Sequence, residues 1–175
     1  EGPVDFPLSY GLATFVRKPI TIRSFGSVSV YPGRESAGRG HPRIVQYVNV
    51  RHESRDLTIY NFHGLVLDEP DPKMDSPERL EQSRKIRTLL DAEEGRKILC
   101  GDFNLRPDTE SLRILEGGMI NLVKVHSIST TRSPLYTRTE KFSDYILVSP
   151  EIRIENFEVL TNVVSDHLPL ALSFS

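Results

Sequence analysis

The chain has 175 residues, 38% hydrophobic and 26% charged, with a formal net charge of −2 and a pI near 6.2. These values are typical of one globular domain and exclude a protein whose whole surface is a footprint for a polyanion. Its apolar runs are shorter than the ~18 residues of a membrane helix, so we expect no membrane span. Cys100 is the only cysteine, which precludes an intramolecular disulfide and favours a reducing compartment such as the cytoplasm.

Extended segments dominate the first third of the chain. Alternating apolar positions and β-branched residues predict strands over residues 11–17, 20–23, 28–31, 44–50 and 57–62. Proline, glycine and charged residues separate several of these segments and favour tight turns. The strands are therefore expected to form an antiparallel meander.

The densest basic region spans residues 34–55. Its positively charged or titratable side chains are Arg34, Arg39, His41, Arg43, Arg51, His52 and Arg55. Two interpretations stay open for this region. It either forms solvated turns that flank a strand, which the charge pattern favours, or it contacts the phosphate backbone of a nucleic acid.

Two helices are predicted after these strands. Ser76 can cap the first helix, Pro77 suits its first position, and Gly95 is expected to end it. A second, shorter helix is predicted over residues 109–116, because two glycines follow it. Residues 127–133 are expected to form a Ser/Thr-rich loop, and the remainder is predicted to be strands.

Four short polar clusters each adjoin one end of an apolar run. Residues 61–64 (Asn-Phe-His-Gly) and 101–104 (Gly-Asp-Phe-Asn) follow such runs, whereas residues 143–145 (Ser-Asp-Tyr) and 165–167 (Ser-Asp-His) precede them. If the later strands run antiparallel to the earlier ones, all four clusters meet at one edge of the assembly. Such a gathering of carboxylates and histidines indicates a metal-dependent phosphoryl-transfer site.

Asp102 and Asn104 lie two residues apart, so an extended backbone would point both side chains the same way. A carboxylate beside a carboxamide can hold and orient a water molecule or a metal-bound phosphate oxygen. The same residue types are also favoured in turns, and for this cluster alone that alternative stays open.

The last two clusters suggest a divided task. Asp166 would face a hard cation and His167 the substrate phosphate. Asp144 is the candidate partner of His167, because a carboxylate on one ring nitrogen fixes the tautomer and leaves the other nitrogen for acid–base work. Polar turns before strands are the structural alternative for both clusters.

His63 ends a predicted strand, where it can donate a hydrogen bond to a phosphate oxygen and stabilise charge in the transition state. A lone histidine is, however, more often structural. Asn61 lies on the same face and is a candidate to steady the loop or the imidazole near the substrate. Arg132, with Thr130 and Arg138, is a candidate contact of the substrate phosphate.

Taken in order, the four clusters resemble the endonuclease/exonuclease/phosphatase superfamily, the metal-dependent phosphodiesterases and phosphatases related to pancreatic deoxyribonuclease. The resemblance spans residues 11–174. It implies an α/β fold, a four-layer αββα sandwich of two mostly antiparallel sheets, with the active site at one end of the sheets. The implied activity is that of a nuclease-like hydrolase.

The resemblance also implies roles for six polar side chains: Asp102 and Asn104 orient the attacking water, Asp166 binds Mg²⁺, Asp144 and His167 form a dyad, and His63 contacts the phosphate. Mn²⁺ is a second candidate cation. The implied reaction is in-line attack of water on the phosphorus of a phosphodiester or phosphomonoester, without a covalent enzyme intermediate.

The sequence departs from the family pattern at its front. Family members begin with a strand bearing an asparagine, a helix, and a second strand that ends in a metal-binding glutamate, whereas this chain opens at Glu1 past that point. We therefore expect residues 1–175 to be a single, N-terminally incomplete domain of this type. By itself such a chain would bind metal poorly and turn over slowly.

Two further function classes stay open. One is a catalytically inactive relative that binds a phosphate ligand, and the other is a nucleic-acid-binding module that uses the basic region. Within the enzyme class, DNA, RNA, a nucleotide, an inositol phosphate and a phospholipid head group are all candidate substrates. The oligomeric state is open as well.

Overall fold

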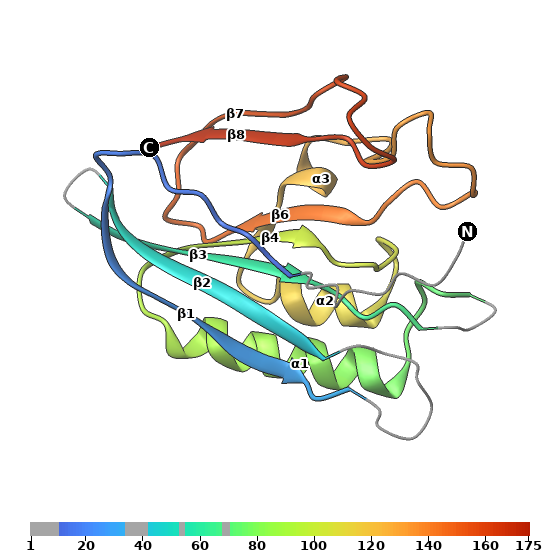
Figure 1. Ribbon diagram of the computed structural model, residues 1–175, viewed down its shortest axis with the longest axis horizontal. Coiled ribbons are helices and arrows are strands. Elements are labelled where there is room, and N and C mark those ends of the chain that lie inside the picture. Colours follow the sequence, from blue (N-terminus) through green and yellow to red (C-terminus); the bar gives the residue numbers. More distant parts are fainter. Residues whose placement is uncertain (1–10, 34–41, 53–54, 68–70) are drawn as a thin grey trace, which may run out of the picture.

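Figure 1 shows the computed structural model of the protein, in which residues 11–33, 42–52, 55–67 and 71–175 are described. Part of the basic region therefore lies outside the described residues, including Arg34, Arg39 and His41. The remaining chain forms two β-sheets and three helices.

The larger sheet has six strands in the order β1–β2–β3–β4–β6–β5. Their bounds are β1 (Thr21–Tyr31), β2 (Arg43–His52), β3 (Arg55–His63), β4 (Arg96–Asp102), β5 (Ile120–Asn121) and β6 (Asp144–Val148). All neighbours pair antiparallel except β3 and β4, which are parallel. A parallel pair needs a crossover connection, which the first helix supplies.

The second sheet consists of β7 (Ile154–Val159) and β8 (Leu170–Phe174), paired antiparallel. It lies on the opposite side of the larger sheet from the two longer helices (Figure 1). Phe157 of β7 belongs to the same buried core as Leu57 and Val148 of the larger sheet. The α/β class with two packed, mostly antiparallel sheets is thus confirmed, and described residues form three of the four expected layers.

The first helix, α1 (Pro77–Ala92), begins as predicted. The Ser76 hydroxyl accepts a hydrogen bond from the backbone N–H of Arg79, and Pro77 occupies the first turn. Ile86 and Leu90 lie on its buried face. The helix ends at Glu93, shortly before Gly95, which adopts a φ of +85°. Its position against the sheet fixes the loop that follows β3.

The second helix, α2 (Glu110–Glu116), agrees with its prediction, with Thr109 as the N-cap and Gly117 as the C-cap. A third, four-residue helix, α3 (Leu122–Val125), was not predicted. Its length is too short for a periodic apolar pattern to be visible in the sequence. None of the described helices combines the length and apolar character that a membrane crossing requires.

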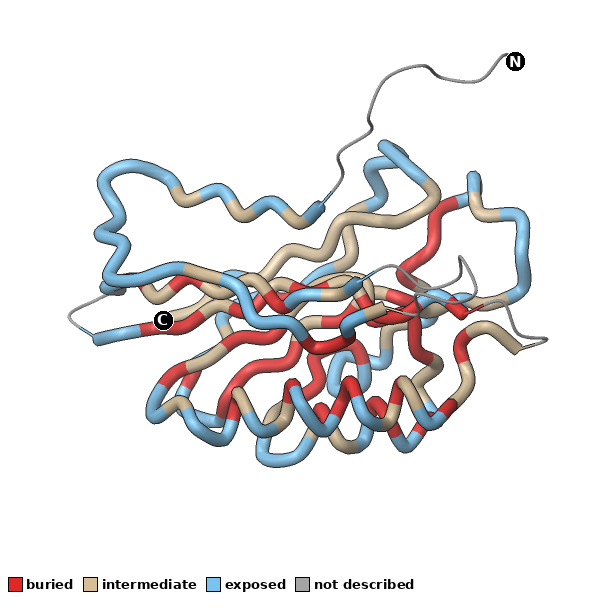
Figure 2. Tube along the Cα trace, turned by 60° about the horizontal axis from the view of Figure 1, so that its bottom comes forward, coloured by how far each residue is buried: buried red, intermediate tan, exposed pale blue. Residues whose placement is uncertain are grey.

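One strand prediction for the start of the chain is wrong, and two others describe parts of a single strand. Residues 11–17 have no regular secondary structure and are largely exposed (Figure 2). They lie beside β2 and β3 through side-chain contacts, such as the 2.6 Å hydrogen bond from Thr14 Oγ1 to Gln46 Oε1. The separate strands predicted at 20–23 and 28–31 are one strand, β1, whose register shifts between Ile22 and Ser24.

Candidate active site

The ends of three neighbouring strands place three of the predicted site residues in one row. In the parallel pair β3–β4, His63 lies opposite Asp102, and in the antiparallel pair β4–β6, Asp102 lies opposite Asp144. Strands β3 and β4 end at the edge where β6 begins. The expectation that polar clusters after the early strands meet those before the later ones is confirmed for this edge.

Two glycines allow the ends of β3 and β4 to approach each other closely. A Cβ on Gly64 would lie 2.0 Å from the carbonyl oxygen of Phe103, and a Cβ on Gly101 would lie 2.0 Å from that of Phe62. Gly101 also has a φ of +136°, which side-chain-bearing residues rarely adopt. The Gly64 N–H donates to the carbonyl of Asp102 at 2.7 Å. The absence of a side chain at these two glycines therefore allows the close backbone contact between β3 and β4 at the row.

The fourth cluster, residues 165–167, reaches the row from the loop that precedes β8. His167 lies just before β8 and forms an isolated β-bridge with Arg132. Its Nδ1 lies 2.9 and 2.8 Å from Oδ1 and Oδ2 of Asp144. The predicted Asp144–His167 pair is therefore in hydrogen-bond contact, although the two residues come from different sheets.

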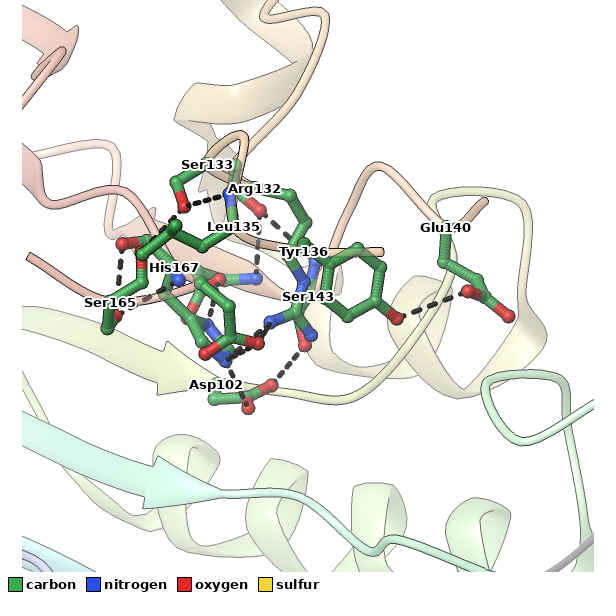
Figure 3. Close-up of polar contacts among 12 residues, drawn as sticks. Asp102, Arg132, Ser133, Leu135, Tyr136, Glu140, Ser143, Ser165 and His167 are labelled. Carbon is green, nitrogen blue, oxygen red and sulfur yellow. Dashed lines mark hydrogen bonds and ion pairs between the residues drawn. The ribbon is translucent and has the colours of Figure 1, made fainter. Parts of the chain in front are cut away.

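Arg132 indicates which nitrogen of the His167 ring carries the proton. A guanidinium has donors only, so its Nη1 contact with Nε2 of His167 requires that nitrogen to accept (Figure 3). Nδ1 then carries the proton and donates it to Asp144. This neutral tautomer, with a lone pair on Nε2, is the form that a general base needs.

The two histidines of the site have opposite electrostatic environments. The hydrogen bond to Asp144 raises the pKa of His167 above its ordinary value, while burial opposes the shift. Burial lowers the pKa of His63, although Asp102, with Oδ2 3.7 Å from His63 Nε2, partly offsets it. Burial also raises the pKa of Asp144, against the bond from His167. Separated pKa values of this kind suit different acid–base roles.

Asp102 and Asn104 come together differently from the sequence expectation. Asn104 adopts a φ of +52°, so the strand does not continue through it and the extended arrangement is wrong. Instead, the Asn104 N–H donates to Asp102 Oδ1 at 2.9 Å in a turn. The Ser143 hydroxyl also donates to Asp102 Oδ1 and lies 3.4 Å from Asn104 Oδ1. The turn thus leaves Asp102 Oδ2 facing the two histidines.

Arg132 and Tyr136 form a rim beside the row. The guanidinium of Arg132 stacks 4.2 Å from the centre of the Tyr136 ring, and its Nη1 lies 3.1 Å from Asp166 Oδ2. The Tyr136 hydroxyl donates to Glu140 at 3.1 Å, as Figure 3 shows. Only 7% of the Arg132 side chain is exposed, whereas 47% of the Asp166 side chain is exposed.

Two buried donors at the site have no hydrogen-bond partner in the described part of the chain. They are Nδ2 of Asn104 and Nε of Arg132. Buried polar groups are nearly always hydrogen-bonded in folded proteins, so unpartnered donors beside a cluster of reactive groups indicate a place for an acceptor-rich ligand.

The donor set fits a hard divalent cation in part. Asp102, Asp144 and His167 each offer one ligand atom, and these atoms lie within 4.8 Å of one another. Carboxylate oxygens suit Mg²⁺. The Nδ1 atom of His167 is already bonded to Asp144, so the carboxylates are the better ligands. Asp166 is not in this group and is paired with Arg132.

Of the other sequence candidates, Asn61 and Thr130 hold loops in place. The Asn61 amide donates to the Ala13 carbonyl at 3.3 Å, which ties down residues 11–14. Thr130 Oγ1 donates to the carbonyl of Lys141 at 2.9 Å, and Arg138 is exposed. Sequence reasoning missed the contacts of Ser143 and Tyr136. Ser143 had a signal, because it lies inside a cluster, whereas Tyr136 sits in a loop without a recognisable pattern.

Comparison with known proteins gives one family match. The model of the Endonuclease/Exonuclease/phosphatase family matches residues 2–167. No curated protein sequence matches the chain.

Several solved structures share the fold. Mannosyl-6-phosphatase from Bacteroides thetaiotaomicron matches 89% of this chain and 67% of its own, with a TM-score of 0.68 and 18% identity. The human Nocturnin catalytic domain with bound sulfate matches 92% and 62%, with a TM-score of 0.61 and 20% identity. TDP2 from D. rerio, complexed with a single-strand DNA product, matches 89% and 68%, with a TM-score of 0.65 and 15% identity. The chain thus spans about two thirds of the length of these relatives.

Proposed function

The chain belongs to the endonuclease/exonuclease/phosphatase family, and we propose that it carries the active site of a metal-dependent phosphoesterase. The substrate would be a phosphodiester or phosphomonoester, with nucleic acid as one candidate. We further propose that residues 1–175 belong to one domain, because helices and both sheets share a core. The observation that carries the function is the His63–Asp102–Asp144 row with His167 bonded to Asp144.

In the proposed reaction, His167 takes a proton from the attacking water at Nε2. The Asp144 carboxylate holds the ring through Nδ1 and stabilises the imidazolium that forms. Arg132 now occupies Nε2, so the guanidinium must move away before water can reach it. A substrate phosphate supplies the reason to move, because it is a stronger partner for a guanidinium than a neutral imidazole.

Asp102 would orient the water. Its Oδ1 is occupied by Ser143 and the Asn104 N–H, which leaves Oδ2 free to accept from a water. This Oδ2 lies 3.7 Å from His63 Nε2 and 3.8 Å from His167 Nε2. Separations of this length suit a bridging water between the carboxylate and the imidazoles.

The unpartnered donors would bind the phosphate. Asn104 Nδ2 and Arg132 Nε are buried without an acceptor, and phosphate oxygens can satisfy both. His63 adds a third donor in its neutral form, because its pKa is lowered by burial. Donors fixed before the substrate arrives stabilise the charge that grows in the transition state.

A divalent cation, Mg²⁺ or secondarily Mn²⁺, would be held by the carboxylates of Asp102 and Asp144, with Asp166 as a further ligand. When bound, it supplies positive charge that offsets the charge developing on the phosphoryl oxygens. Asp166 is available only if Arg132 releases it. The phosphate would thus draw the guanidinium away from both the base and the cation ligand.

The proposal is tested with a panel of phosphomonoesters and phosphodiesters, assayed with Mg²⁺, with Mn²⁺ and with a chelator. We expect cation-dependent hydrolysis that falls at least about a hundredfold in His167→Ala, with an unchanged circular dichroism spectrum. The solvent-exposed Arg84→Ala, on α1 and outside every candidate site residue, is the matched control and should keep its activity. Equal hydrolysis by wild type and His167→Ala would overturn the assignment of the base.

One observation favours a second candidate function, an inactive relative that binds a phosphate ligand. A single guanidinium covers both Nε2 of His167 and the Asp166 carboxylate. Calorimetric titration with inorganic phosphate and a phosphodiester separates the two functions. Binding without turnover of any member of the panel would support the binding module.

A further inference from the structure

Lys73 is a buried lysine outside the four clusters. It lies in the loop between β3 and α1, and only 4% of the residue is exposed. A lysine is rarely buried this deeply without a partner. Its ammonium donates to the carbonyl oxygen of Phe142 at 2.7 Å. Phe142 directly precedes Ser143 and Asp144, so Lys73 contacts the segment that delivers the dyad carboxylate.

The backbone that carries Lys73 is itself held in place. The buried guanidinium of Arg79, in the first turn of α1, donates to the carbonyl of Met74 at 2.7 Å and to that of Pro72. These carbonyls stand on either side of Lys73. The Arg106 N–H also donates to the Lys73 carbonyl at 3.2 Å. The ammonium therefore projects from a fixed loop.

The segment that Lys73 contacts leads directly into the row. Strand β6 begins at Asp144, so Phe142 and Ser143 precede the strand ladder. Ser143 connects this segment to the row through two hydrogen bonds. Its carbonyl accepts from the Phe103 N–H at 2.7 Å, and its hydroxyl donates to Asp102. A shift of the Phe142 carbonyl would move the start of β6 relative to Asp102.

The pKa of Lys73 reflects its burial and the charged side chains around it. Burial, and to a smaller extent Arg132, lower the pKa of Lys73 to about 8, while Asp102, Glu140 and Asp144 oppose the shift. Lys73 also lies 5.6 Å from the centre of the Tyr136 ring. The ammonium is thus protonated at neutral pH and available as a donor.

We propose that Lys73 is a positioning residue: by holding the Phe142 carbonyl it fixes Ser143 and Asp144, and through Asp144 it orients the His167 ring. The effect on turnover rests on the proposed function. The effect on the Asp144–His167 hydrogen bond does not, because that bond is present without any ligand.

The experiment follows the His167 Nδ1 proton by nuclear magnetic resonance in Lys73→Met, which removes the ammonium and keeps an unbranched side chain. Lys97→Met is the matched control. The Lys97 ammonium also donates to backbone carbonyls, those of Leu90 at 2.8 Å and of Glu93, but Lys97 lies near the opposite end of β4 from Asp102. His167→Ala assigns the signal.

We expect the proton to exchange with water at least about tenfold faster in Lys73→Met, the loss associated with one charge-assisted hydrogen bond, and at the wild-type rate in Lys97→Met. Lys73→Arg should restore slow exchange, because arginine also donates to a carbonyl. A folded Lys73→Met with wild-type exchange would overturn the proposal. If Lys73→Met does not fold, a folded Lys73→Arg with fast exchange would overturn it.

A kinetic arm separates this inference from the proposed function. If the protein hydrolyses phosphate esters, Lys73→Met should lower kcat about tenfold or more with little change in KM, because the lysine orients the dyad without touching substrate. Absence of hydrolysis in the wild type would contradict the proposed function and leave the exchange measurement as the test of Lys73. An unchanged kcat in an active Lys73→Met would contradict the positioning role.

Discussion

The row at the strand edge and the rim beside it are built by different means. His63, Asp102 and Asp144 lie opposite one another because the backbone ladder of β3, β4 and β6 places them there. Arg132 and Asp166 are held by a salt bridge and by stacking on Tyr136. Moving a residue of the row requires moving main chain, whereas moving the rim requires only side-chain rotation.

This difference separates preorganised groups from responsive ones. The Arg132–Asp166 pair is exposed only on the Asp166 side, and a phosphate can compete for Arg132 because it pairs with a guanidinium in bidentate geometry. Backbone hydrogen bonds in a buried ladder exchange only with local unfolding. We therefore expect changes at the row to damage the fold or the chemical step, and changes at the rim to alter ligand binding. The four predictions below test this contrast in order of decreasing effect.

Gly64→Ala should break the row through the backbone. The added methyl group would lie 2.0 Å from the Phe103 carbonyl oxygen, so β3 and β4 must separate. We expect a loss of about 4 kcal/mol or more in the free energy of unfolding, measured by urea denaturation. Gly11→Ala is the control, because no atom lies within 4 Å of its added methyl group. Similar losses in both variants would contradict the close-approach argument.

Asp144→Asn should leave the row in place and remove its charge. Nδ1 of His167 then loses its ionised partner, so the pKa of His167 falls and the imidazolium is less stabilised. We expect kcat to drop about a hundredfold to a thousandfold, with the unfolding midpoint in urea nearly unchanged. A variant with wild-type kcat would show that the pair has no role in the reaction.

Arg132→Met should change the rim and uncover Nε2 of His167 while the row keeps its place. The substitution removes the cation that stacks on Tyr136 and bonds Asp166, while the strand ladder is untouched. We expect about a tenfold to hundredfold loss of kcat/KM and a loss of stability of about 1 kcal/mol. Arg84→Met, at an exposed position of α1, serves as the control. A larger loss of stability than in Gly64→Ala would reverse the contrast between row and rim.

The pH dependence of stability should give the smallest effect. The folded-state pKa of His167 is raised above the ordinary 6.5, so its contribution is fully present below pH 6.5 and is lost as the pH rises through the raised value. His63 has a lowered pKa, so its contribution to stability changes with pH only in the range below 6.5. We expect the unfolding free energy to decline as the pH rises above 6.5 through the raised pKa of His167.

Asp144→Asn supplies the check on this pH effect, because it should abolish the decline by removing the cause of the raised pKa of His167. Catalytic rate should change in the opposite direction over the same range, since the neutral imidazole is the base. A decline of equal size in Asp144→Asn would assign the effect to another group.

Local patterns in the sequence predicted several parts of the structure correctly. The capping residue Ser76 placed the start of α1 and the two glycines after Glu116 placed the end of α2, because a helix boundary depends on the nearest few residues. The direction of each apolar run predicted which polar clusters share an edge. Pairing of β3, β4 and β6 then confirmed this, since β6 runs antiparallel to β4 and so begins at the edge where β3 and β4 end.

Other features depended on contacts between distant segments. Residues 11–17 have strand-like composition, but a strand needs a partner ladder, and their contacts with β2 and β3 are made by side chains. Asn104 has a positive φ, which the two-residue spacing from Asp102 did not reveal. Lys73 carried no motif at all, and its significance comes from the Phe142 carbonyl 69 positions away.

The sequence by itself determined the order of the polar clusters, because that follows from residue types and their spacing; the order carried the resemblance to the family, and the resemblance implied the α/β class. Only the tertiary structure decided how the clusters are oriented: which nitrogen of His167 accepts, which oxygen of Asp102 is free, and that Arg132 covers both the base and Asp166. Hydrogen bonds are directional and short-ranged, so their pattern is set by the final positions of segments that are distant in the chain.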